Sequence, residues 1–177
     1  LWDKKLVYEG FKILPYCARC TTPLSNFETN LGYKDVQDPA ITVAFQLKDQ
    51  PNTYILAWTT TPWTLPSNLA LAVGEDINYV KTDDQGSFYI LAEELLNKYY
   101  KDLSQVKIAE KYKGKDLVGI KYVPLFPYFS NLKKENAFRI VSGHHVSIES
   151  GTGVVHIAPG FGEDDAEIGK VESLPSV

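Results

Sequence analysis

The chain of 177 residues contains no methionine and only two cysteines, and it has no long hydrophobic run. No segment approaches the roughly 20 apolar residues of a membrane span, and residues 1–10 lack the apolar core of a signal peptide, so we expect no membrane partner. Because position 1 is not methionine, we expect a piece of a longer protein. Two cysteines cannot form a disulfide framework, so a reducing, cytoplasmic location is the simplest expectation.

The chain also lacks an excess of positive charge. Its formal net charge is −4 at pH 7, with 18 Lys and Arg against 22 Asp and Glu. A protein that holds nucleic acid by electrostatic attraction alone is usually basic, so the composition argues against that role. It still allows a domain that handles one end of a nucleic acid while another module supplies the affinity. The lysines between 98 and 115 are more simply explained as a solvated face.

Motifs for metal binding and covalent catalysis are incomplete. Cys17 and Cys20 form a CxxC, but a structural zinc needs four ligands, and neither a second CxxC nor a nearby histidine follows. The patterns GxSxG, GxxxxGK[ST] and GxGxxG are also missing. We therefore expect no metal and no cofactor. A hydrolase built from this chain would activate water rather than form a covalent intermediate.

What the chain does contain is a series of short segments with strand character. With 44% hydrophobic residues it can bury one core. Alternating or continuous apolar residues predict strands at 41–47, 53–60, 69–73, 77–83, 87–92, 115–123, 137–148 and 151–160. Helical spacing predicts helices over 92–103 and from 161 onward. Many short strands with few helices predict an α+β fold, with a barrel-like mixed sheet and a few peripheral helices.

The first 37 residues differ from the rest. They mix short apolar runs with Gly10, Pro15 and Pro23, which predicts turns and a short strand rather than a packed core. We interpret residues 1–37 as a stem that leads into one domain over residues 38–177.

The stretch LAWTTTPWTLPSN (56–68) places Thr59, Thr60 and Thr61 directly before Pro62. Side chains alternate along a strand, so the first and third hydroxyls should share one face. Proline cannot donate to a sheet ladder and forces the strand to end. The hydroxyls would then lie at a sheet edge, where they could bind a ribose, a carbonyl or a water. Threonine is also common in strands for purely structural reasons, and that explanation stays open.

The stretch GTGVVHIAPGFGEDD (151–165) joins a predicted strand to a predicted helix. His156 lies within the apolar strand, and Asp165 follows nine residues later near the helix start. Within one strand–loop–helix unit these two side chains could meet in one pocket, where an ionised Asp165 would pair with an ammonium group. The alternatives are a core histidine and a helix cap.

Taken together, WTTTPWTLPSNLALAV (58–73) and GTGVVHIAPGFGEDD resemble the inserted editing domain of isoleucyl-tRNA synthetase, a class I aminoacyl-tRNA synthetase. The related valyl and leucyl enzymes carry arginine where this chain has Thr61. The segment PYCARCTTPLSNFE (15–28) resembles the connection from the catalytic core of the synthetase into the insertion. Because the family continues further, we expect the domain to extend past residue 177.

The resemblance implies hydrolysis of the ester that joins valine, or a similar small amino acid, to the tRNA for isoleucine. It implies two partners, the mischarged 3′ end of the tRNA and the rest of the synthetase. Thr59, Thr60 and Thr61 would position the terminal adenosine, the ester and the attacking water.

The resemblance also implies roles for four further residues. Asp165 would hold the α-ammonium, and His156 would form the wall that excludes a larger side chain. Asn68 would be a further polar position of the pocket, and Trp63 would shape the same loop.

Three alternatives stay open from the sequence. The chain could be an editing domain of the valyl or leucyl type, which Thr61 disfavours. It could be a non-catalytic module that binds an amino acid or a nucleotide, and such a module would bind esters without turnover. It could also be a zinc-dependent nucleic-acid-binding module built on Cys17 and Cys20, against which the acidic net charge argues.

Overall fold

The computed structural model describes residues 1–10, 12–134 and 136–177. The chain forms two compact units, Leu1–Gln37 and Asp38–Val177. None of the helices in these described residues has the length and apolar character of a membrane span.

The smaller unit is built from local interactions. It contains the 3₁₀ helix η1 (Trp2–Lys4), the hairpin of β1 (Tyr16–Cys17) and β2 (Thr22–Pro23), and the helix α1 (Asn26–Asn30). The Ser25 hydroxyl accepts from the Glu28 backbone N–H, and the Glu28 carboxylate accepts from the Ser25 N–H, which is a capping box that starts α1. No residue of its described elements is buried, so the unit has no hydrophobic core of its own.

The larger unit contains a five-stranded sheet of order β3–β4–β7–β6–β8. Its strands are β3 (Ile41–Gln46), β4 (Thr53–Thr59), β6 (Asn78–Asp84), β7 (Ser87–Ala92) and β8 (Lys107–Lys113). All neighbours are antiparallel except β4 and β7, which are parallel. The hairpin expected from residues 41–60 is confirmed, with Ile41 opposite Thr59.

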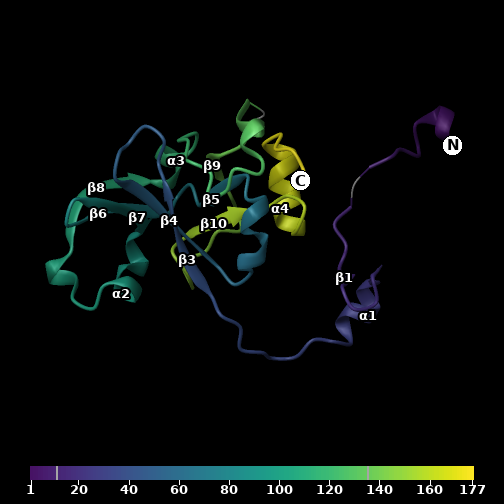
Figure 1. The fold of residues 1–177 in the computed structure, drawn as a ribbon, viewed down its shortest axis with the longest axis horizontal. Coiled ribbons are helices and arrows are strands. Elements are labelled where there is room, and N and C mark those ends of the chain that lie inside the picture. Colours follow the sequence, from purple (N-terminus) through teal and green to yellow (C-terminus); the bar gives the residue numbers. More distant parts are fainter. Residues whose placement is uncertain (11, 135) are drawn as a thin grey trace. The chain divides into compact units, whose positions relative to one another are not determined.

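A three-stranded sheet of order β10–β5–β9 completes the larger unit. It consists of β5 (Ala70–Val73), β9 (Arg139–Ser142) and β10 (Val154–Ile157). The middle strand β5 is antiparallel to β10 and parallel to β9, and all four of its residues are buried. In Figure 1 the helix α4 (Glu163–Val171) lies beside this sheet, while α2 (Leu96–Tyr99) lies near the far end of the five-stranded sheet.

The two sheets share one core because β10 packs against β4. Tyr79 of β6 is fully buried at this junction, where its hydroxyl donates to the carbonyl of Gly153 at 2.6 Å and accepts from the N–H of Gly74 at 3.1 Å. Burial raises the pKa of Tyr79 to about 12, so the hydroxyl keeps its proton. The α+β class is confirmed, and two connected sheets give the mixed, barrel-like arrangement.

The predicted helix over 92–103 is too long. The structure has η3 (Glu93–Leu95) followed by α2, and Tyr100 already has an extended backbone. The hydroxyls of Tyr99 and Tyr100 bond to different strands, with Thr42 of β3 at 3.0 Å and Thr82 of β6 at 2.8 Å. These tertiary contacts end the helix where local spacing would have continued it.

The strand predicted at 115–123 does not form, the strand predicted at 137–148 is shorter than expected, and the strand β8 was missed. Residues 114–117 form a short helix, α3 (Gly114–Leu117), because the Asp116 carboxylate accepts from the Lys113 N–H at 3.0 Å and starts a helical turn. Beyond β9 the chain turns at Gly143 instead of continuing as a strand to 148. The lysine-rich segment that contains β8 is a strand as well as a solvated face.

Candidate functional site

The candidate site begins where β4 ends. Thr59 is the last residue of the strand, and Pro62 opens the 3₁₀ helix η2 (Pro62–Ser67) directly after it. Since proline lacks an N–H and fixes its own φ, the strand cannot extend through it. The turn folds the hydroxyls of Thr59, Thr61 and Thr64 onto one another.

These three hydroxyls form a continuous row that ends on His156 of β10. Thr59 Oγ1 and Thr61 Oγ1 are 3.3 Å apart, Thr61 Oγ1 and Thr64 Oγ1 are 3.3 Å apart, and Thr64 Oγ1 lies 3.1 Å from His156 Nε2. The Thr61 N–H also donates to Thr59 Oγ1 at 3.0 Å. The expectation that the first and third hydroxyls share a face is therefore confirmed.

The shortest bond of Thr64 allows donors to be assigned along the row. Thr64 spends its single proton on the Thr61 carbonyl at 2.8 Å, so its oxygen must accept from both Thr61 and His156. Thr61 then donates to Thr64 and accepts from Thr59. All three hydroxyl protons are used within the protein. The row therefore offers acceptor lone pairs to a ligand and has no proton to donate.

His156 is neutral in this arrangement. It is 6% exposed, and burial lowers the pKa of its ring to about 4. If Thr64 donates to the Thr61 carbonyl, its oxygen accepts from His156, and this assigns the ring proton to Nε2. Nδ1 is then a buried acceptor, and it has no partner among the described residues. The ring is held at a fixed orientation at the end of the hydroxyl row.

Asp165 lies in the first turn of α4, immediately after β10 in the fold. Its Oδ2 accepts from the backbone N–H of Ala158 at 2.9 Å, which ties the helix to the end of the strand. Burial raises the pKa of Asp165, while the Ala158 N–H and the charge of His145 lower it. Its Oδ1 has no partner in the described part of the chain, so it is available to a cation.

Two of the predicted residues lie outside the hydroxyl row but on the same turn. Thr60 is exposed, and its hydroxyl makes no hydrogen bond within the described residues, so it is the hydroxyl of the triplet that can still donate. Trp63 is 66% exposed on η2. It borders the turn from the solvent side rather than packing inside it.

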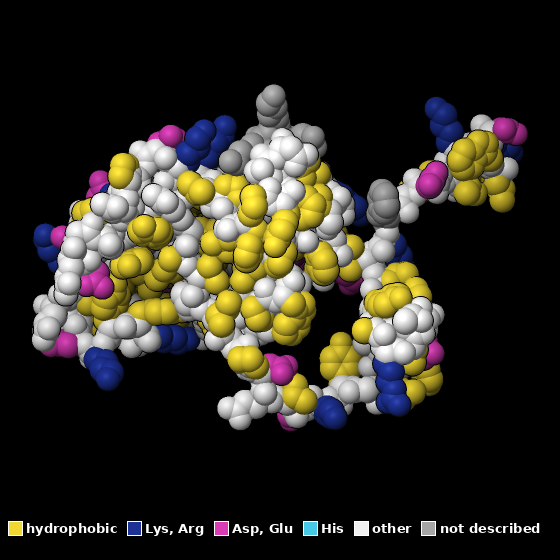
Figure 2. Space-filling model, viewed as in Figure 1, with side chains coloured by type: hydrophobic (Ala, Val, Ile, Leu, Met, Phe, Trp, Pro, Cys, Tyr) yellow, Lys and Arg dark blue, Asp and Glu magenta, His cyan; other side chains and the backbone are white. Residues whose placement is uncertain are grey.

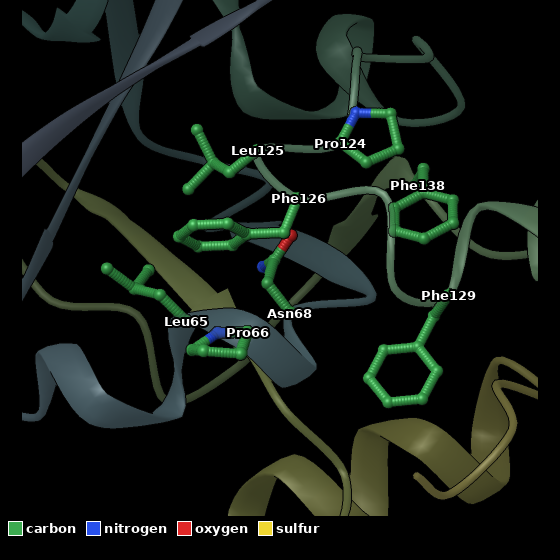
Figure 3. A pocket seen from close by; sticks show the side chains of 8 residues that line it. All are labelled: Leu65, Pro66, Asn68, Pro124, Leu125, Phe126, Phe129 and Phe138. Carbon is green, nitrogen blue, oxygen red and sulfur yellow. The ribbon is translucent and has the colours of Figure 1, made fainter.

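Asn68 occupies a different place. Its side-chain amide donates to the Ala70 carbonyl at 2.8 Å, and its oxygen accepts from the Tyr122 hydroxyl at 2.7 Å. Figure 3 shows it inside an apolar crevice, between Leu65 and Pro66 on one side and Phe126 on the other. Both ends of the amide are therefore occupied by hydrogen bonds within the protein. The structure does not bring Asn68 to the hydroxyl row.

Sequence reasoning missed Thr64 and His145. Thr64 follows Thr61 at the i, i+3 spacing of a single helical turn, and recognising that Pro62 starts a helix would have revealed it. His145 carries two ring nitrogens that are buried and without a partner among the described residues.

Cys17 and Cys20 lie at the β1–β2 turn, with the Cys20 N–H donating to Cys17 Sγ at 3.3 Å. Both thiols are unpaired. The described ranges contain no cluster of three or more His, Cys, Asp or Glu side chains that could hold a metal.

Comparison with known proteins connects this site to a family. Residues 1–125 match the family described as tRNA synthetases class I (I, L, M and V). The chain belongs to the class I tRNA synthetases. Among proteins similar to this synthetase chain is an isoleucine–tRNA ligase of Bdellovibrio bacteriovorus, which is 56% identical over 168 residues. A cytoplasmic isoleucine–tRNA ligase of Saccharomyces cerevisiae is 53% identical over 169 residues. Each alignment covers 93% of this chain and 16% of the relative, so the chain spans about a sixth of their length.

Solved structures share the fold of the synthetase chain. The structure titled GlLeuRS-CP1 has a TM-score of 0.60 at 18% identity, covering 75% of this chain and 59% of its own. The editing domain of the Plasmodium knowlesi cytosolic leucyl-tRNA synthetase has a TM-score of 0.59 at 16% identity, covering 76% and 62%. The fold is that of synthetase editing domains, and the resemblance expected from the two motifs is confirmed.

Proposed function

We propose that this chain is the editing domain of an isoleucyl-tRNA synthetase, and that it hydrolyses the ester between valine and the tRNA for isoleucine. The observation that supports this most directly is the row of acceptor oxygens ending on a neutral, orientationally fixed His156. Relatives with half their residues identical are isoleucine–tRNA ligases, and the fold is shared with editing domains. The partners would be the mischarged 3′ end and the rest of the synthetase, in the cytoplasm.

The reaction adds water across an activated ester. Water attacks the carbonyl carbon, the carbonyl oxygen becomes an oxyanion, and the ribose oxygen leaves with a proton as the amino acid is released. Thr59 and Thr61, whose oxygens each keep one free lone pair, can orient a water by accepting its hydrogens. Thr60 can donate to the oxyanion or to a ribose oxygen, since its proton is not used by the protein. The ribose hydroxyl beside the ester would assist the proton transfer.

Asp165 would hold the α-ammonium of the substrate. Its Oδ2 is fixed by the Ala158 N–H, which leaves Oδ1 to pair with a cation. A charge-assisted contact of this kind is about twice as strong as a neutral hydrogen bond. Since every substrate of an editing site carries the same α-ammonium, this contact serves positioning and not selection.

Selection between amino acids would fall to His156. A hydrophobic pocket gains only about 0.8 kcal/mol from one methylene, and isoleucine against valine is the standard example of that limit in this enzyme family. A second site can use the reverse preference by being too small for isoleucine, because overpacking a rigid wall costs roughly 1–3 kcal/mol. The imidazole held by Thr64 is such a wall.

The test is deacylation by the 177-residue chain of the tRNA for isoleucine charged with valine, with the isoleucine-charged tRNA as control. We expect release of valine and retention of isoleucine. Asp165→Ala should abolish release, and Asp165→Asn is the matched variant that keeps the size but not the charge. His156→Ala should admit the isoleucyl ester.

A valyl-adenosine ester extends the test to a substrate that needs no further tRNA contacts. If the wild-type chain cleaves neither valyl ester, the proposal is wrong. Saturable binding of that ester without turnover would instead identify a binding module.

A further inference from the structure

The two outermost strands of the five-stranded sheet, β3 and β8, treat their free edges differently. β8 reads KIAEKYK and breaks register with β6, whereas β3 reads ITVAFQ and pairs with β4 without a break. Natural proteins usually protect an exposed sheet edge with charged residues, proline or a bulge. β8 has charges and an irregular register, and β3 has none of these devices. An unprotected edge of this kind is expected where another strand covers it.

The hydrogen bonds at the end of β3 show which of its backbone groups face outward. The Val123 N–H donates to the Gln46 carbonyl at 2.8 Å, on the side away from β4. The Leu47 N–H donates the other way, to the first residue of β4, at 2.8 Å. In an antiparallel pair the N–H and C=O of one residue point to the same side, and successive residues alternate. The backbone groups of Thr42 and Ala44 therefore point outward, like those of Gln46.

The protein itself covers only one end of this edge. The segment 121–123 lies antiparallel along the end of β3, and the next residue, Pro124, has no N–H with which to continue the pairing. Thr42 and Ala44 are exposed, and the described residues provide no backbone partner for their outward groups. The free edge offers two N–H donors and two C=O acceptors at the spacing of a strand.

The side chains of β3 indicate what kind of strand would fit. Val43 and Phe45 pack into the hydrophobic core, and Phe45 is fully buried. Ile41 lies on the same face by strand alternation, yet its side chain is 38% exposed. An added strand with apolar side chains at alternate positions would cover Ile41 while its backbone bonded to Thr42 and Ala44.

We propose that the outer edge of β3 accepts an extended segment of the parent synthetase as a further strand of this sheet. The chain spans about a sixth of the isoleucine–tRNA ligases that it matches, so most of each relative has no counterpart in it. A second copy of the chain fits less well, because its own segment 121–123 leaves it only the same short stretch, 42–44, to offer. Strand addition takes its affinity from main-chain hydrogen bonds and its specificity from alternate side chains.

The experiment measures amide hydrogen exchange at Thr42 and Ala44 in the 177-residue chain and in the intact ligase, by mass spectrometry with residue-resolved fragmentation. In the chain both amides should exchange as those of an open strand edge. In the ligase we expect exchange to be slower by about tenfold or more, since each amide gains a hydrogen bond. The Val43 amide faces β4 and should be protected in both proteins, which makes it the internal control.

A pair of matched variants locates the protection on this edge. Ala44→Pro removes one outward N–H, and proline is tolerated on an edge strand, so the urea midpoint of the chain should change little. In the ligase the same substitution should restore fast exchange at Thr42. Ala109→Pro changes the same residue type on β8, at a position without a partner in the register with β6, and should leave Thr42 protected.

Three results overturn the inference. The first is equal exchange of Thr42 and Ala44 in the chain and in the ligase, which decides the matter without any variant. The second is protection that persists at Thr42 in the Ala44→Pro ligase. The third is protection in the chain alone that grows with its concentration and accompanies a dimer in sedimentation, which would assign the edge to a second copy. None of these readouts depends on valine release, so they leave the proposed hydrolysis untouched.

Discussion

The two sheets of the larger unit share one core but differ in how they meet water. The middle strand of the three-stranded sheet, β5, has every residue fully buried, whereas β8, at the edge of the five-stranded sheet, has almost every residue exposed. Figure 2 shows charged side chains along the outer rim of the five-stranded sheet. The groups of the candidate site come from the junction of the two sheets, where β10 packs against β4.

The charges on β8 have a separate use. An edge strand leaves a row of backbone groups unpaired, which is a template for association with another chain. Lys107 pairs with Asp83 at 2.7 Å, and Lys111 pairs with Glu93 at 2.6 Å. The lysines of these pairs are exposed, so the pairs keep the edge solvated and contribute little to stability. The five-stranded sheet therefore uses its edge for solubility, and the three-stranded sheet uses its centre for stability.

The largest expected effect is the loss of stability when a buried side chain of β5 is truncated. Leu71→Ala in β5 removes a side chain with 0% exposure and leaves a cavity, which should cost about 2–5 kcal/mol of the free energy of unfolding. Ile108→Ala in β8, where the side chain is 39% exposed, is the matched control. Urea denaturation measures both. Equal losses would contradict the difference between the sheets.

The next effect concerns His156 and pH. The ordinary pKa of 6.5 falls to about 4 on folding, so between these values the unfolded chain binds a proton that the folded chain does not. The free energy of unfolding should therefore fall by about 3 kcal/mol as the pH drops from 6.5 to 4. His156→Gln should lose this part of the pH dependence. The free energy of unfolding is measured by urea denaturation at several pH values in that range. If it depends on pH equally in both proteins, the assignment of a buried, neutral ring to His156 is wrong.

Tyr79→Phe tests the link between the sheets. The variant keeps the ring and removes the hydroxyl that joins the Gly153 carbonyl to the Gly74 N–H. Leaving these two backbone groups unpaired should cost about 1–3 kcal/mol of the free energy of unfolding. Tyr112→Phe on β8, whose ring is partly exposed, is the control. A larger loss in the control would show that the Tyr79 hydroxyl is not the stabilising link between the two sheets.

The smallest effect lies at the exposed edge. Asp83 has its pKa lowered by the hydrogen bond from Lys107, yet neither partner is buried. Lys107→Ala should leave the urea midpoint unchanged within error at 0.15 M salt, because solvent screens exposed charges. A clear shift of the midpoint would show that the edge contributes to stability after all.

Much of the fold could be predicted from the sequence because its strands follow simple patterns. The alternation in 41–47 and the continuous apolar run in 69–73 gave strands close to those observed. The errors occurred where distant partners decide the structure. The helix after residue 92 ends where Tyr99 and Tyr100 bond to two different strands, and no local pattern indicates that end. The lysine-rich composition of β8 likewise gives no local indication of a strand.

The candidate site was harder to predict than the fold. Alternation correctly paired Thr59 with Thr61, but it could not reveal that Thr64 closes the row or that the row has no proton to give. Those facts depend on a turn of η2 and on a contact 92 residues away in sequence. Asn68 was assigned to the pocket through a resemblance, while its partners Ala70 and Tyr122 become visible only in three dimensions.

The loop before β10 requires glycine at two positions. Gly151 and Gly153 both have positive φ, and a Cβ at Gly153 would lie 2.5 Å from the Cβ of Ala92. At each position the backbone angle and the neighbouring atoms reject every other amino acid for independent reasons. In a library of random variants these two codons should tolerate almost no replacement, although neither residue has a side chain with which to touch a substrate. Intolerance to mutation at such positions is evidence of close backbone packing and not of a catalytic or binding role.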